Sequence, residues 1–72
     1  MFNCPVCLYP KIKENPALET YEICPSCGIE YGYQDGGPKP KKYYYKRLRE
    51  RWINNGKLWW SNHTKKPDWW NP

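Results

Sequence analysis

Four cysteines in two pairs of the same design are the residues most able to do chemistry in this chain. Cys4 and Cys7 form one Cys-Pro-x-Cys pair, and Cys24 and Cys27 form the other, with sixteen residues between the pairs. Thiolates at this spacing hold a tetrahedral metal ion, and four of them are the ligand set of a structural zinc site. Such a site has no open position for water, so it stabilises a fold and activates nothing. We therefore predict one structural Zn²⁺ bound by all four cysteines.

Iron and a redox-active dithiol are the alternatives for these cysteines. Tetrahedral sulfur geometry also suits iron, and the turn from Cys24 to Gly28 resembles one half of a rubredoxin site, which would make the protein a one-electron carrier. We favour zinc because the first turn has Leu8 in place of that glycine and because the acidic surface of the rubredoxin type is missing. A dithiol enzyme needs a cysteine at a helix N-terminus in a βαβ setting, which this sequence does not predict.

Other catalytic groups are scarce. His63 is the only histidine, and the chain has no nucleophile elbow and no phosphate-binding loop. We predict that the protein is not an enzyme and that His63 is a surface residue.

The length of the chain makes a metal important for folding. Seventy-two residues form at most one domain, and a single apolar core of this size supplies only about 3–5 kcal/mol. A structural zinc supplies about 10–16 kcal/mol. Metal binding and folding are therefore expected to be one event.

The hydropathy of the chain predicts a cytoplasmic protein without membrane contact. Residues 1–20 lack the apolar run of a secretory signal, and no window approaches the ~20 apolar residues that span a bilayer. In a reducing compartment, paired cysteines are metal ligands more often than disulfides.

A β-hairpin is predicted around the second cysteine pair. Residues 20–23 and residues 29–33 alternate polar and apolar side chains, which is the period-two pattern of half-buried strands. In each turn the proline brings no amide proton, and the following amides can point at the first sulfur. Gly28 suits a left-handed backbone, whereas Leu8 at the equivalent position would cost about 1–2 kcal/mol.

A basic amphipathic helix is predicted from Tyr43 to Asn55, ended by Gly56. One face carries Tyr44, Tyr45, Leu48 and Trp52, and the opposite face carries Lys46, Arg47, Glu50 and Arg51. Four tryptophans among the last fourteen residues should pack back onto the ribbon. The predicted fold is a small metal-stabilised α+β zinc ribbon with an amphipathic C-terminal helix and a tryptophan-rich tail. It is a single domain that comprises a zinc-ribbon module (residues 1–36), a linker (37–42), and the helix and tail (43–72).

The charge asymmetry has two interpretations: the opposite charges draw the two halves of the chain together, or the basic half presents a face to an anionic partner. Residues 1–38 carry two lysines against five acidic residues, and residues 39–72 carry ten basic residues against two acidic ones. Residues 39–52 interleave cations with aromatic rings, as single-stranded nucleic-acid surfaces do, but Trp, Tyr and Arg also dominate protein interfaces. The candidate contact residues are Lys41, Lys42, Arg47, Arg51, Trp59 and Trp60.

Four segments carry a resemblance to known proteins: residues 2–7, residues 21–28, the stretch from Trp52 to Trp59 and the closing Trp-Asn-Pro. Through them the chain resembles small bacterial cysteine-rich proteins of the CPCC or zinc-ribbon type. Members are often encoded beside toxin genes, which implies an immunity-like or antitoxin-like role through binding of a toxin. This chain departs from the group at Leu8, where glycine is usual, and in the lysine-rich segment after Tyr33. The resemblance implies the four cysteines as ligands, and Trp52, Trp59 and Trp69 as packing residues.

We therefore predict a non-catalytic zinc-binding protein that acts as a protein-binding module. Nucleic-acid binding through the basic aromatic helix is the first alternative. A rubredoxin-like iron protein that transfers electrons is the second.

Overall fold

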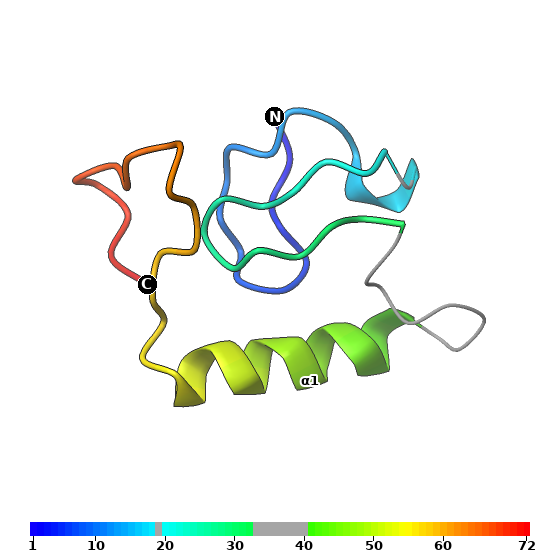
Figure 1. The fold of residues 1–72 in the computed structure, drawn as a ribbon. Helices are drawn as coiled ribbons and strands as arrows, with labels where there is room; N and C mark the ends of the chain where they lie inside the picture. The colour runs from blue at the N-terminus through cyan, green and yellow to red at the C-terminus, as the bar shows by residue number, and fades with distance from the viewer. Residues whose placement is uncertain (19, 33–40) are drawn as a thin grey trace.

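The structure, a computed structural model, describes residues 1–18, 20–32 and 41–72. Two cysteine turns, the first at residues 4–9 and the second at residues 24–29, form the centre of the molecule. Helix α1 (Lys41–Asn54) runs along one side of them, and the C-terminal tail, residues 57–72, folds against one end (Figure 1). A single 3₁₀ turn, η1 (Pro16–Leu18), is the other helical element among these residues.

The predicted β-hairpin is not present in the described residues. Ile23 and Glu30 form only an isolated antiparallel bridge. The reason is local, because Tyr21 and Gly32 have φ angles of 61° and 92°, and a strand requires negative φ throughout. The two segments still run antiparallel, since Tyr21 N–H donates to the carbonyl of Tyr31 at 2.9 Å, but no regular ladder forms. Tyr33, the last residue of the predicted second strand, lies outside the described residues.

The two cysteine turns have the same backbone design. In each turn the amide of the first cysteine donates to the carbonyl five residues later, and the amide four residues later donates back to the cysteine carbonyl, at 2.8–2.9 Å. Leu8 thus occupies the position of Gly28, and their φ angles are 72° and 86°. The first turn keeps the geometry of the second although its residue is leucine, which costs about 1–2 kcal/mol. The side chain of Leu8 is 55% exposed, so burial compensates little of that cost.

The core is built around the sulfurs. Its buried members are Cys4, Val6, Cys7, Tyr9, Ile12, Cys24, Ile29, Tyr31 and Trp52. Trp52 is the one buried member from α1, and Tyr45 and Leu48 of the same helix pack against this core and are half-buried. The cysteines and the residues next to them in sequence thus form the centre of the core.

Helix α1 begins two residues before the prediction. Lys41 and Lys42 of the predicted linker belong to the helix, and the rest of that linker lies outside the described residues. At the other end, Gly56 has a φ of 89° and its amide donates to the carbonyl of Ile53 at 3.0 Å. Gly56 therefore ends the helix as predicted, with the left-handed residue that helix C-termini favour.

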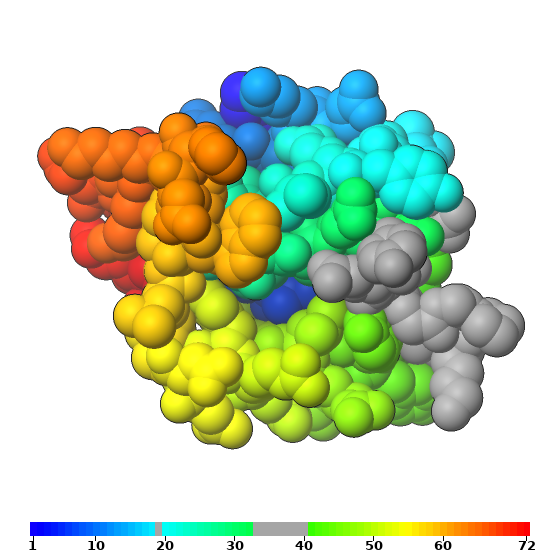
Figure 2. Space-filling view, viewed as in Figure 1, coloured from blue at the N-terminus to red at the C-terminus, as the bar shows by residue number. Residues whose placement is uncertain are grey.

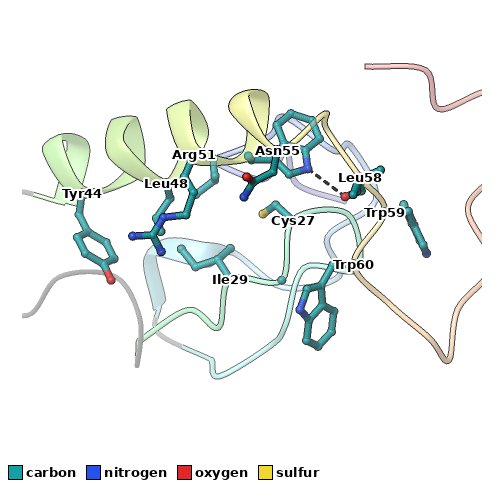
Figure 3. A pocket seen from close by; sticks show the side chains of 12 residues that line it. Cys27, Ile29, Tyr44, Leu48, Arg51, Asn55, Leu58, Trp59 and Trp60 are labelled. Carbon is teal, nitrogen blue, oxygen red and sulfur yellow. Dashed lines mark hydrogen bonds between the residues drawn. The ribbon is translucent and has the colours of Figure 1, made fainter.

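The two predicted faces of α1 are confirmed. Trp52 is buried and Tyr44, Tyr45 and Leu48 are half-buried, whereas Lys46, Arg47, Glu50 and Arg51 are exposed. Arg49, which lies between these faces, donates from Nη1 to the carbonyl of Val6 at 3.0 Å. Trp52 donates from Nε1 to the carbonyl of Leu58 at 3.2 Å (Figure 3). These two bonds tie the helix to the first cysteine turn and to the start of the tail.

The ring of Tyr9 contacts three of the four tryptophans of the tail. Its ring makes edge contacts with Trp59 and Trp70, at centroid distances of 5.5 and 5.4 Å, and it stacks on Trp69 at 5.9 Å. Trp70 also donates from Nε1 to the hydroxyl of Ser26 at 3.0 Å. The tail forms a lobe at the end of the molecule (Figure 2). Ring contacts join it to the first cysteine turn, and this hydrogen bond joins it to the second, together with those from the amides of Trp60 and Ser61 to carbonyls of that turn.

No helix in the described part of the chain is long and apolar enough to cross a membrane.

Candidate metal centre

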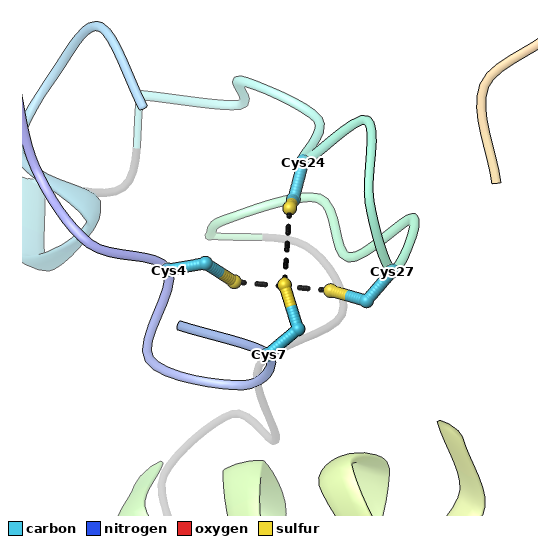
Figure 4. Close-up of side chains that lie close together, drawn as sticks. All are labelled: Cys4, Cys7, Cys24 and Cys27. Atoms are coloured by element: carbon cyan, nitrogen blue, oxygen red, sulfur yellow. Dashed lines mark hydrogen bonds between the residues drawn. The ribbon is translucent and has the colours of Figure 1, made fainter. Parts of the chain in front are cut away.

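The structure brings the four predicted ligands together at one point (Figure 4). All four Sγ atoms lie within 4.8 Å of one another. Cys4 and Cys27 are separated by 3.8 Å between sulfurs, and Cys7 and Cys24 by 3.6 Å. A tetrahedral ion with bonds of about 2.3 Å to sulfur needs sulfurs about 3.8 Å apart. The cluster therefore fits one metal ion bound by four thiolates.

The sulfurs are not disulfide-bonded. All four cysteines are free, and separations of 3.6 and 3.8 Å greatly exceed the S–S bond length of about 2.05 Å. Cys4 and Cys24 are fully buried and Cys7 nearly so, while Cys27 is half-buried. The centre is closed to solvent except on the side of Cys27.

The electrostatics of the cluster favour a bound cation. Hydrogen bonding with Cys24 lowers the pKa of Cys4 and of Cys7, whereas it raises the pKa of Cys27. The four thiols thus cannot all ionise together in so small a buried space. A divalent metal removes this conflict, because it deprotonates the thiols that coordinate it.

Hydrogen-bond donors around the cluster also fit a charged metal–thiolate group. The amide of Val6 donates to Cys4 Sγ at 3.4 Å. This is the predicted bond from the residue after the proline to the first sulfur. The buried hydroxyl of Tyr31 has no hydrogen-bond partner among the described residues. Burial and then the neighbouring Cys4 sulfur raise the pKa of Tyr31, so this hydroxyl stays a donor. A buried donor without a partner costs about 1–3 kcal/mol, and a metal-bound thiolate is the acceptor that would satisfy it.

The identity of the ion is limited to two metals by the ligands. Four thiolates in tetrahedral geometry suit zinc or iron. The turns around Leu8 and Gly28 have the same backbone, so the leucine does not by itself argue against either metal.

Three of the six predicted contact residues line one groove. This α1 groove lies between helix α1, the second cysteine turn and the start of the tail, and has a volume of about 530 Å³. Arg51, Trp59 and Trp60 line it (Figure 3). The other three are placed elsewhere on α1: Lys41 is its half-buried first residue, Lys42 is exposed with its ammonium 5.5 Å from the ring centre of Tyr43, and Arg47 is exposed.

The tryptophans are placed partly as the resemblance implied. Trp52 is buried and Trp59 half-buried, whereas Trp69 stacks on Tyr9 but remains 54% exposed. Trp70, which sequence reasoning did not single out, is half-buried and packs against the core. No spacing rule separates Trp69 from Trp70, since both follow Asp68 in an irregular segment. His63 is exposed, as predicted.

Comparison with known proteins finds a partial similarity to an uncharacterized protein. No protein-family model and no solved structure matches the chain. It is similar to the uncharacterized protein YoaQ of Bacillus subtilis (strain 168), with 36% identity over 39 residues that cover 47% of this chain and 33% of YoaQ. The match thus spans about a third of that relative's length. Together with the four-cysteine cluster, it is consistent with a small cysteine-rich metal-binding protein.

Proposed function

We propose that this protein is a non-catalytic metalloprotein in which one Zn²⁺ holds a scaffold that binds another protein. The observation that carries the proposal is the closed sulfur cluster. Three of its four cysteines are buried, and the four thiolates complete a tetrahedral coordination sphere. A complete sphere leaves no position for a substrate or a reactive water, so the metal acts on shape.

The surface that the scaffold presents is basic and aromatic. Lys46, Arg47 and Arg51 are exposed along α1, and Trp60 of the tail, which lines the same groove as Arg51, is 52% exposed. The net charge is +5. An acidic protein surface is the partner that this charge attracts. The resemblance to proteins encoded beside toxin genes makes a toxic enzyme our candidate partner, and an immunity-like protein would act in the cytoplasm.

Two measurements test this function. Elemental analysis should find about one zinc per chain in colourless purified protein. Affinity purification of the tagged protein from its native host should recover one partner at a stoichiometric level, and a chain stripped of metal should lose it. A chain that recovers no stoichiometric partner would contradict the protein-binding role, even if the zinc is present.

Nucleic-acid binding is the second candidate, favoured by the exposed cations of α1. Lys42, Lys46 and Arg47 are all exposed, but the rings of Tyr45 and Trp52 pack toward the core and are not free to stack on bases. Phosphate contacts make log affinity fall by about 0.7–0.9 per log unit of salt for each phosphate neutralised. Failure to shift any DNA or RNA at about 50 mM salt would eliminate this candidate.

Electron transfer through iron is the remaining candidate, since the sulfur geometry suits both metals. Iron bound by four thiolates is coloured, whereas zinc is not. If protein purified from its native host absorbs visible light, the bound metal is iron and our proposal of zinc is wrong.

A further inference from the structure

We infer that the α1 groove binds an extended acidic segment of a protein partner, with one apolar or aromatic side chain inserted as an anchor. The inference rests on the proposed protein-binding function and specifies its site. The apolar walls of the groove, the guanidinium of Arg51 and the length of the groove each support this occupant.

Apolar side chains line both sides of the groove (Figure 3). Ile29 of the second cysteine turn and Leu48 and Trp52 of α1 line its inner part. Leu58 and Trp60 line the side formed by the tail, where they are 69% and 52% exposed. Large apolar side chains exposed together around a concave surface are typical of interaction sites. The groove is therefore suited to receive an apolar anchor.

Arg51 is the one charged side chain that lines the groove among the residues that the structure describes. It is exposed, extends from α1 toward Ile29 (Figure 3), and makes no hydrogen bond or ion pair to the described residues. A guanidinium offers five donors in a planar fork that matches a carboxylate. Lys46 and Arg47 on the neighbouring surface of α1 are also exposed, and they outnumber Glu50, the one acidic residue of α1. An acidic segment therefore matches both the groove and its surroundings.

The length of the groove favours an extended peptide. Its lining runs along α1 from Tyr44 to Asn55, which at 1.5 Å per residue is about 16 Å. An extended chain advances about 3.3 Å per residue, so about five residues would fill it. A segment of that length can place one side chain against the apolar walls and a carboxylate beside Arg51.

The groove also adjoins the metal centre. Cys27 lines it and is the one ligand that is only half-buried. A peptide in the groove would cover the exposed side of Cys27. Binding should therefore slow the extraction of zinc by a chelator, a readout that does not depend on activity or on an identified partner.

The experiment uses the intact zinc protein and a short blocked peptide in which one phenylalanine is flanked by glutamates. We expect saturable shifts of the Trp60 indole N–H signal in ¹H–¹⁵N spectra, with little change at Trp69, and zinc extraction slowed severalfold. A peptide with glutamines in place of glutamates and another with alanine in place of phenylalanine should each bind about tenfold more weakly.

Matched variants separate the groove from general charge attraction. Arg51→Gln should weaken binding about tenfold or more, whereas Arg47→Gln, which removes the same charge outside the groove, should weaken it less than about threefold. Leu58→Glu places an acid on an exposed wall and should abolish binding. Absence of saturable binding, equal losses in Arg51→Gln and Arg47→Gln, or equal affinity for the alanine peptide would overturn the inference.

Failure of the inference can be distinguished from failure of the proposed function. If the native partner is recovered equally well by wild type, Arg51→Gln and Leu58→Glu, the protein-binding function stands and the groove is not its site. If the acidic peptide occupies the groove but no native partner is recovered, the groove is a peptide site and the proposed function falls.

Discussion

The indole of Trp60 lies directly against Gly28, so that a Cβ at position 28 would come within 2.5 Å of Trp60 Cδ1. The backbone holds this contact in place, because the amide of Trp60 donates to the carbonyls of Pro25 and Ser26, at 3.2 and 3.1 Å. The tail therefore docks on the second cysteine turn at the one position that has both a left-handed backbone and no side chain. Gly28 serves the turn and the docking of the tail together.

Gly28→Ala should destabilise the zinc protein by about 1–3 kcal/mol. The alanine would be strained at a φ of 86°, and the Trp60 side chain would have to move away from the turn. Urea denaturation of the zinc-loaded protein measures this loss. Unchanged stability would show that Trp60 moves aside without cost and that the contact does not hold the tail.

Leu8→Gly should have the opposite effect and raise the free energy of unfolding by up to about 1 kcal/mol. Leu8 has a φ of 72° and an exposed side chain, so glycine relieves strain and loses little packing. The greater chain entropy of unfolded glycine offsets part of the gain. The same urea titration measures this change. If Leu8→Gly lowers the free energy of unfolding by more than about 1 kcal/mol, the strain at Leu8 is not the dominant effect.

These two turns also show what the sequence could and could not predict. The ligands, the helix faces and the end of α1 at Gly56 follow from spacing, which is local information. The prediction of a β-hairpin was wrong because Tyr21 adopts a φ of 61°. An alternating polar and apolar pattern does not indicate that a tyrosine will adopt that conformation. The contacts of Arg49 with Val6 and of Trp70 with Ser26 join residues more than forty positions apart, so only the folded chain reveals them.

Arg49→Ala should destabilise the protein by about 1–2 kcal/mol. Its guanidinium donates to the carbonyl of Val6 in the first cysteine turn, and a hydrogen bond from a charged group is worth about 1.5–3 kcal/mol at most. Arg47→Ala is the matched control, because Arg47 is exposed and its loss should change stability by less than about 0.5 kcal/mol. Equal melting temperatures for the two zinc-loaded variants would contradict a clamping role for Arg49.

Tyr31→Phe tests whether the buried hydroxyl is a donor to the metal-bound thiolate. Loss of an outer-shell donor typically weakens metal binding about 10- to 100-fold, so zinc affinity in a chelator competition should fall by about tenfold. In cobalt-substituted protein, the sulfur-to-cobalt charge-transfer band should also shift, because Cys4 loses a hydrogen bond.

Tyr9→Phe is the control for that substitution. Tyr9 is also a buried tyrosine, but its ring contacts the tail tryptophans, and removal of its hydroxyl should leave the cobalt spectrum unchanged. If Tyr31→Phe leaves both affinity and spectrum unchanged, or even raises stability, the hydroxyl is a buried cost with no role at the centre.

Acid should unfold the protein together with loss of its metal. Coordination depresses the pKa of each thiol far below its unfolded value of about 8.5, so the stability that the metal contributes is present above that pH and is lost as pH falls and protons compete for the sulfurs. In the cluster itself the pKa of Cys4 and Cys7 is lowered, whereas the pKa of Cys24 and Cys27 is raised, so a depressed pKa at all four sulfurs depends on the metal. Far-ultraviolet circular dichroism and zinc release, followed together from neutral to acidic pH, should therefore show one transition.

Because the apolar core is small, a strong chelator at neutral pH should produce the same unfolded spectrum. A chain that keeps its helix signal after complete zinc removal would show that the core folds without the ion, and the metal would then have to be assigned a role other than holding the scaffold.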